Sequence, residues 1–151
     1  MHSYSIYSLG MMLENLENYK ALSHNMLANT EQLKRELLSH QLMVYEQQAL
    51  SVNEAITHHI WIQCSDKTNA FELYKHWEQY GFLTNYRLLP YHLGYGIRMG
   101  LSAATVSGLL PTDIPELANL LAQIYHSTEY NERLKHLSEE FIIKIKERNL
   151  A

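Results

Sequence analysis

Residues 58–64 read His-His-Ile-Trp-Ile-Gln-Cys and residues 96–101 read Gly-Ile-Arg-Met-Gly-Leu, and these two stretches decide the fold class. The first is rich in β-branched and aromatic residues, which favour a strand. The second is a short apolar run between glycines, and we expect a strand there too. Residues 82–90 form another extended segment, which Pro90 ends because proline has no N–H to donate to a ladder. Together they predict a small sheet, with two weaker strands expected upstream at 42–45 and 49–52.

Periodic apolar residues predict a long helix before these strands. In the first forty residues, apolar side chains recur at spacings of three and four, and neither proline nor glycine interrupts residues 11–40. The most apolar part is residues 3–16, which leave little polar face. An apolar surface of this kind is seldom left exposed on a monomer. We therefore expect this segment to be covered, either by a second copy of the chain or by another domain.

Three further helices are expected downstream. Asp66, Lys67 and Thr68 offer turn and N-cap chemistry, and the helix that follows ends at Gly81, which accepts a positive φ. Thr112 or Asp113 is expected to cap the next helix, and a final helix carries apolar residues from position 134 to 145. The order of elements predicts a single α+β unit, in which a small, mostly antiparallel sheet is covered on one face by helices.

Composition excludes several classes of protein. The 151 residues include 12 Lys and Arg against 16 Asp and Glu, a formal net charge of -4, so no excess of cations is available for nucleic-acid phosphates. No apolar run approaches the roughly 18 residues that a membrane span needs. The lone Cys64 cannot form an internal disulfide, and Met1–Tyr4 does not begin a secretory signal. We expect a cytoplasmic protein that binds neither nucleic acid nor membrane.

Neither the nine histidines nor the cysteine indicates a metal site. His58 and His59 are adjacent on an expected strand, so their side chains point to opposite faces. The other histidines are scattered without a helical i, i+4 pair. Cys64 is interpreted as a small buried residue and not as a nucleophile, and the tyrosines and tryptophans as core and interface bulk.

The motifs in the middle of the chain resemble the C-terminal part of serine hydroxymethyltransferase, a fold-type I pyridoxal-phosphate enzyme. The matching pieces occur in family order and extend, less specifically, over most of the chain. They are Met1-His2, Thr57 to Ile62, Tyr80-Gly81-Phe82-Leu83-Thr84-Asn85, Pro90, Gly96-Ile97-Arg98-Met99-Gly100, Ala103-Ala104-Thr105 with Gly108, and Asp113.

The resemblance implies an aminotransferase-type C-terminal domain at residues 41–151, which an interface helix at 1–40 precedes. In the family, a larger domain holds pyridoxal phosphate on a lysine upstream of these motifs. None of the lysines of this chain follows the family's run of threonines or lies in a glycine-rich turn; they are Lys20, Lys34, Lys67, Lys75, Lys135, Lys144 and Lys146. We expect no catalytic and no cofactor-binding residue here, and a chain that is inactive alone and works with a cofactor-binding large domain.

Arg98 is the residue that the resemblance singles out. In the family, the arginine of this "G-I-R-x-G" strand binds the α-carboxylate of the amino-acid substrate. A guanidinium suits that role because it presents parallel donors and stays charged. Gly96 and Gly100 permit close backbone approach beside it. The alternative is an arginine at a strand end that pairs with a surface acid.

Asn85 and Arg87 are possible neighbours of a substrate or folate site. Family members carry a second Asn, two residues after the first, that contacts the pteridine of tetrahydrofolate, and in this chain that position is Arg87. An Asn offers a donor and an acceptor, whereas an Arg offers only donors and adds a charge. The change favours a folate-independent parent that performs retro-aldol or transaldol chemistry on a β-hydroxy amino acid. Alternatively, Arg87 faces solvent without a ligand.

Three functions remain open. The chain is the small domain of a pyridoxal-phosphate enzyme, or a stand-alone dimerisation module derived from that domain, or one chain of a split aldolase or transaldolase. The first and third require a partner that carries the reactive lysine. The second requires only self-association through residues 3–16.

Overall fold

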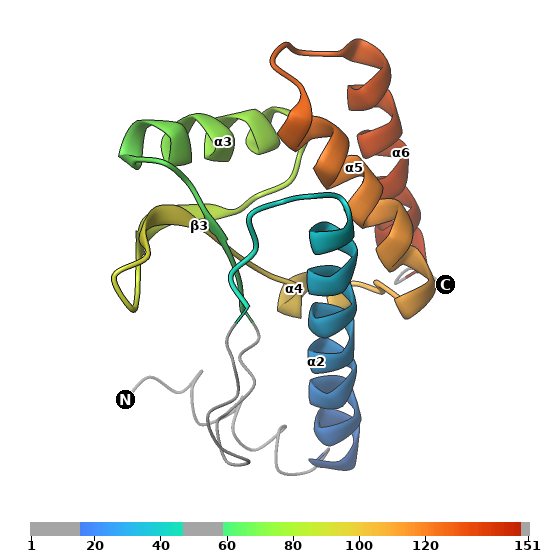
Figure 1. Cartoon of the computed structure of the whole chain (residues 1–151). Helices are drawn as coiled ribbons and strands as arrows, with labels where there is room; N and C mark the ends of the chain where they lie inside the picture. Colours follow the sequence, from blue (N-terminus) through green and yellow to red (C-terminus); the bar gives the residue numbers. More distant parts are fainter. Residues whose placement is uncertain (1–15, 47–58, 149–151) are drawn as a thin grey trace, which may run out of the picture.

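The computed structural model describes residues 16–46 and 59–148 (Figure 1). The strand expected at 49–52 and the apolar segment 3–15 lie outside the described residues. In chain order the elements are α2 (Leu16–Ser39), β1 (His59–Gln63), α3 (Lys67–Gln79), β2 (Asn85–Leu89), β3 (Gly94–Gly100), α4 (Ser102–Val106), the 3-10 helix η1 (Pro111–Asp113), α5 (Ile114–His126) and α6 (Glu132–Arg148). No helix within these ranges is long and apolar enough to cross a bilayer.

The three strands form one antiparallel sheet in the order β1-β3-β2. The central strand β3 therefore pairs with both neighbours, and Arg98 lies opposite Trp61 on β1 and opposite Asn85 on β2. Because side chains directly opposite each other in such a ladder project to the same face, these three residues share one face of the sheet. The expected α+β class with a small antiparallel sheet is confirmed.

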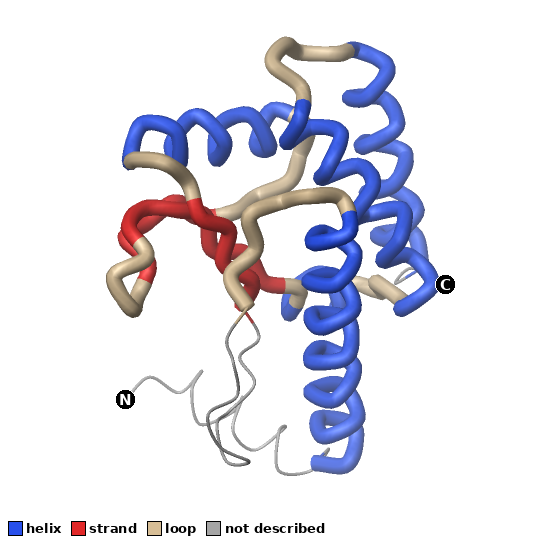
Figure 2. Tube along the Cα trace, viewed as in Figure 1, coloured by secondary structure: helices blue, strands red, loops and turns tan. Residues whose placement is uncertain are grey.

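The two faces of the sheet differ in burial because side chains alternate along each strand. Ile60, Ile62 and Ile97 are fully buried on the face toward the helices. Figure 2 shows the helices gathered above and to the right of the sheet. The opposite face, which we call the open face, carries polar and aromatic side chains that are exposed or half-buried; they are His59, Trp61, Asn85, Arg87 and Arg98.

The core lies between the sheet and the helices. Leu33 and Leu37 of α2 are fully buried in a cluster that also contains residues of α5. Trp77 of α3 is fully buried and donates its indole N–H to the carbonyl oxygen of Leu121 at 3.2 Å. Burial of an aromatic side chain of this size contributes strongly to stability, and the hydrogen bond satisfies its only polar atom.

The ends of α3 and of the long helix follow local rules. Among the three residues expected to supply the cap, it is Asp66 that caps α3, and its carboxylate accepts the Asn69 N–H at 2.8 Å. Gly81 follows the helix at φ 93, the left-handed conformation expected of it. The long helix ends at Ser39, and Leu42 N–H then bonds to the Leu37 carbonyl oxygen. The chain is therefore still turning at the start of the strand expected at 42–45.

That expected strand is reduced to a single bridge between Val44 and Ile62, with backbone bonds that hold the segment along the outer edge of β1. Two other boundaries differ. β2 begins at Asn85 and not at Phe82, because the Phe82 N–H bonds back to the Trp77 carbonyl oxygen. The short helix α4 was not predicted, since five residues are too few to show an apolar period.

Candidate substrate-binding site

Arg98 is half-buried at the centre of the sheet, on the open face. Trp61 flanks it on one side and Asn85 on the other. Within residues 16–46 and 59–148, its guanidinium has no ion pair and no hydrogen bond. The interpretation of Arg98 as a strand residue paired with a surface acid therefore finds no partner in the described part of the chain.

Arg87 lies on the neighbouring strand and projects from the same face. It is paired with Gly96, so it stands diagonally across from Arg98, two residues along β2 from Asn85. Diagonal neighbours of this kind have Cα atoms roughly 7–8 Å apart, within reach of long side chains. Arg87 is exposed, and it too has no ion pair or hydrogen bond among the described residues.

A cavity of about 440 Å³ opens on this face and brings the two arginines together. None of the described residues that line it is acidic. They are His59, Trp61, Arg87, Leu88, Leu89, Pro90 and Arg98. The sequence grouped Asn85 with the two arginines. Asn85 lies beside Arg98 but is not one of the residues that line the cavity.

Three aromatic rings cluster at the Trp61 side of the cavity, with Tyr45 stacked on Trp61. The ring centroids of Tyr45 and Trp61 are 5.8 Å apart, and Tyr91 completes the group at 6.3 Å from Tyr45 and 6.1 Å from Trp61. These distances lie in the range in which aromatic pairs attract each other. Sequence reasoning missed the cluster because Tyr45 and Tyr91 belong to loops far apart in the chain. A lone tyrosine in each loop carries no signal.

Gly96 allows the strands of the site to pack closely. A Cβ at this position would lie 2.2 Å from the carbonyl oxygen of Ile62 and 2.6 Å from Cδ1 of Leu89. Only a residue without a side chain fits between them. The tight packing next to Arg98 therefore explains why glycine stands two residues before it.

The lysines of the chain lie away from the strands of the candidate site. All seven lie on helices, none on the sheet that carries Arg98. Several are engaged with acids: Lys34 contacts Glu31 at 3.1 Å, and Lys75 contacts Glu78 at 3.6 Å. An imine-forming lysine instead needs a pocket that favours its neutral form, with donors for the cofactor phosphate.

No group of three or more His, Cys, Asp or Glu residues in the described ranges could hold a metal ion. His76 contacts the Ser127 hydroxyl at 2.9 Å, and His126 contacts the His40 carbonyl oxygen at 2.8 Å. Cys64 is half-buried, and burial, with a smaller contribution from nearby Asp66, raises the pKa of its thiol. A raised pKa leaves less thiolate, which disfavours a nucleophilic role.

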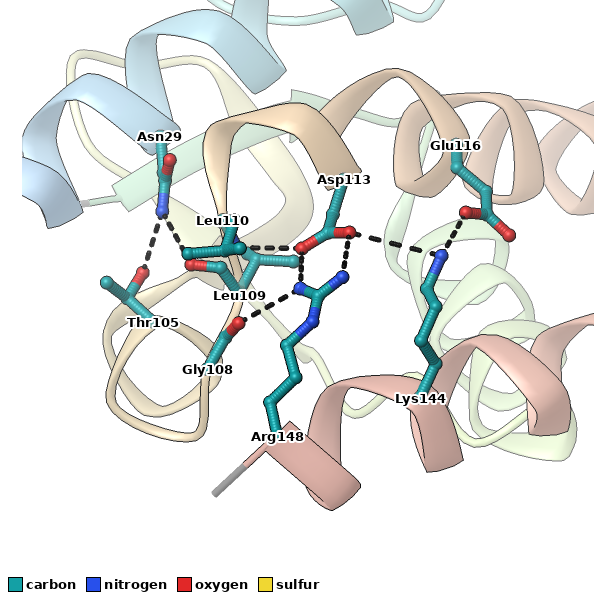
Figure 3. A network of polar contacts seen from close by, with 9 residues as sticks. All are labelled: Asn29, Thr105, Gly108, Leu109, Leu110, Asp113, Glu116, Lys144 and Arg148. Carbon is teal, nitrogen blue, oxygen red and sulfur yellow. Dashed lines mark hydrogen bonds and ion pairs between the residues drawn. The ribbon is translucent and has the colours of Figure 1, made fainter. Parts of the chain in front are cut away.

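A separate polar network ties the C-terminal helix to the loop before α5 (Figure 3). Asp113 is buried, and its carboxylate accepts hydrogen bonds from the Leu110 N–H at 2.8 Å and from the Arg148 guanidinium. Arg148 also donates to the Gly108 carbonyl oxygen at 3.2 Å. Of Thr112 and Asp113, the two residues expected to cap α5, Asp113 stands at the N-cap position. Its carboxylate makes no capping bond to α5 and turns back toward Leu110 and Arg148. Sequence spacing could not show a partner that lies 35 residues away.

Comparison with solved structures identifies the fold. The chain is similar to the crystal structure of L-threonine transaldolase from Pseudomonas fluorescens in its internal aldimine state, with a TM-score of 0.71 and 22% sequence identity. The match covers 83% of this chain and 28% of the transaldolase chain. No protein-family model and no curated protein matches the sequence. The chain thus has the α+β fold of an aminotransferase-type C-terminal domain, as the sequence motifs implied.

An internal aldimine is the imine between an enzyme's lysine and its aldehyde cofactor. The transaldolase therefore forms an imine between a lysine and an aldehyde cofactor, which is the chemistry of the family that the motifs resemble. That family is serine hydroxymethyltransferase, whereas the similar structure is a transaldolase. This chain spans 28% of the length of that transaldolase.

Proposed function

We propose that this chain is the substrate-carboxylate-binding domain of a pyridoxal-phosphate enzyme that acts on amino acids. The observation that carries the proposal is Arg98: a half-buried guanidinium in a cavity on the open face, without a counter-ion among the described residues. A planar guanidinium binds a carboxylate through two parallel hydrogen bonds. The amino-acid α-carboxylate is the ligand that the resemblance assigns to this position.

The proposed parent reaction is a folate-independent aldol cleavage or transaldolation of a β-hydroxy amino acid. Arg87 stands where the resembling family has a folate-contacting Asn, and it opens into the same cavity as Arg98. A guanidinium cannot accept the hydrogen bonds that a pteridine edge donates. The similarity of the fold to a threonine transaldolase supports the same choice.

The chain alone is proposed to be inactive, because the cofactor lysine must come from outside these residues. The partner is either a large domain or, in a split enzyme, a second polypeptide. Pyridoxal phosphate added to the chain should give no L-threonine-dependent imine absorbance beyond that of the same mixture without protein. An L-threonine response that exceeds the protein-free mixture would contradict this part of the proposal.

Carboxylate binding is tested by nuclear magnetic resonance on the full chain at low salt. Addition of L-threonine should shift the Arg98 Nε–H and Trp61 indole N–H resonances, because both residues line the cavity. Arg98→Gln should abolish the shift of the indole signal, and Arg98→Lys should restore little of it, since an ammonium lacks the planar pair of donors. Arg133→Gln, an exposed arginine on α6, is the matched control. An unchanged indole shift in Arg98→Gln would overturn the proposed function.

A dimerisation module remains the second candidate. It depends on the apolar segment 3–16, which, apart from Leu16, lies outside the described residues. If this segment is left uncovered by a large domain, the chain should self-associate through it. Light scattering on the full chain measures this, and a monomer at high concentration would contradict it.

A further inference from the structure

We propose that Arg87 and Arg98 together bind a ligand with two negatively charged groups, so that the substrate of the parent enzyme carries a second carboxylate or a phosphate. The inference rests on the proposed function for the first contact, which is the α-carboxylate on Arg98. It adds the second contact, on Arg87, and with it the class of substrate.

The register of the sheet brings the two guanidinium groups into one site. Asn85 is directly opposite Arg98, and Arg87 is the next residue of β2 that projects from the same face. Both arginines line the 440 Å³ cavity. Its volume exceeds what a single carboxylate fills, so a ligand of amino-acid size can contact both.

Among the described residues, the two positive charges of the cavity have no negative charge beside them. No acidic side chain lines it, and neither arginine has an acid within ion-pair distance there. Elsewhere the chain balances several of its cations: Arg148 pairs with Asp113, and Lys144 pairs with Glu116. In a chain with a net charge of -4, two guanidinium groups on one face, with no acid partner in the described ranges, create a local positive potential that attracts anions.

The chemistry of the guanidinium decides what the second group must be. Arg87 has five N–H donors and no acceptor, so it favours a ligand group that only accepts hydrogen bonds. Carboxylates and phosphates meet that condition and match the guanidinium fork with two oxygens. A neutral side chain or a hydroxyl would leave the Arg87 charge without a counter-ion.

The two arginines differ in exposure, which orients the ligand. Arg98 is half-buried beside the stacked rings of Trp61 and Tyr45, whereas Arg87 is exposed. The α-carboxylate therefore belongs on Arg98, which is the less exposed of the two and lies between Trp61 and Asn85. The second anionic group belongs on Arg87, toward the rim.

The test compares three amino acids on the full chain by magnetic-resonance titration at low salt. L-Threonine carries one anionic group, L-aspartate adds a carboxylate, and O-phospho-L-serine adds a phosphate. At least one of the last two should bind about tenfold more tightly than L-threonine, as expected for one further charge-assisted hydrogen-bonded pair. The tighter of the two identifies the second group.

Variants separate this proposal from the proposed function. Arg87→Gln should remove the advantage of the tighter ligand and leave L-threonine binding within about twofold, while Arg98→Gln should weaken all three ligands and Arg133→Gln none. If Arg98→Gln abolishes binding but all three ligands bind alike and ignore Arg87→Gln, the two-anion site is wrong and the proposed function stands. If no ligand depends on Arg98, both are wrong.

Discussion

At the scale of single residues, Gly96 and Arg98 both shape the candidate site. The arginine supplies the charge of the site, and the glycine lets β1 and β3 approach closely beside it. Gly94, in the same strand, is glycine for a different reason, because it has φ 78 and open space where a Cβ would stand. Glycine is therefore required at position 96 because there is no space for a side chain, and at position 94 because of the positive φ.

Gly96→Ala should destabilise the protein by about 1–3 kcal/mol, the usual cost of overpacking a tight site. The added methyl would collide with the Ile62 carbonyl oxygen, which is backbone and cannot move aside cheaply. Urea unfolding measures the change. Gly94→Ala is the matched control and should cost less, about 1 kcal/mol for the positive φ alone. Equal losses in the two variants would contradict the role assigned to Gly96.

At the scale of elements, the Asp113–Arg148 pair connects α6 to the loop that precedes α5. Burial opposes ionisation of Asp113, but the hydrogen bonds from Arg148 and from the Leu110 N–H outweigh it, so the pKa of this carboxyl is lowered. The same pair raises the pKa of Arg148. Next to it, the amide of Asn29 on α2 donates to the Thr105 hydroxyl on α4 at 3.2 Å and to the Leu109 carbonyl oxygen at 3.4 Å. Helices α2 and α6 therefore both bond to the segment between α4 and α5 (Figure 3).

This pair should make stability depend on acid pH. A carboxyl whose pKa is lower in the folded state stabilises the fold above its ordinary pKa, and that contribution is lost as the pH falls through the lowered value. The free energy of unfolding should therefore decline below about pH 4, where free aspartate begins to protonate. Urea unfolding as a function of pH measures it.

Asp113→Asn provides the comparison. At neutral pH it should lower the free energy of unfolding by about 1–3 kcal/mol, the cost of leaving buried hydrogen-bonding groups poorly paired. Its free energy of unfolding should fall less at acid pH than that of the wild type, because asparagine has no carboxyl group to protonate. Parallel pH profiles would show that Asp113 is not the group responsible.

At the scale of the whole molecule, the helices and the sheet depend on one buried core. Trp77 joins them: it lies on α3, which packs on the sheet, and it donates to the carbonyl oxygen of Leu121 on α5. Its ring is also 6.2 Å from that of Tyr125. Loss of this residue therefore affects two layers of the fold at once.

Trp77→Ala should destabilise the protein by about 3–5 kcal/mol, because it removes the buried ring and leaves a cavity. The loss should be visible as a lower midpoint of thermal unfolding. Phe71→Ala, on the exposed side of the same helix, is the control and should cost less. A Phe71 variant that is as unstable as the Trp77 variant would contradict this account of the core.

The class of fold could be predicted because its signals are local. The strand at 59–63, the Asp66 cap and the Gly81 helix end each depend on residues within one element, and all three appear where expected. The element boundaries that the sequence predicted wrongly depend on backbone hydrogen bonds between elements or within turns. Phe82 stays with the preceding helix through its bond to Trp77, and residues 42–45 follow a turn out of the long helix.

For the site, the sequence by itself determined that Arg98 stands on a strand between glycines, and the motif around it indicated a carboxylate ligand. Its role, and those of Asn85 and Arg87, stay predictions. Only the tertiary structure decided that Arg87 shares a cavity with Arg98, that Tyr45 stacks on Trp61 with Tyr91 beside them, and that Asp113 meets Arg148. The physical reason is that periodicity and turn chemistry act over a few residues, whereas strand register and helix packing join residues that are far apart in the chain.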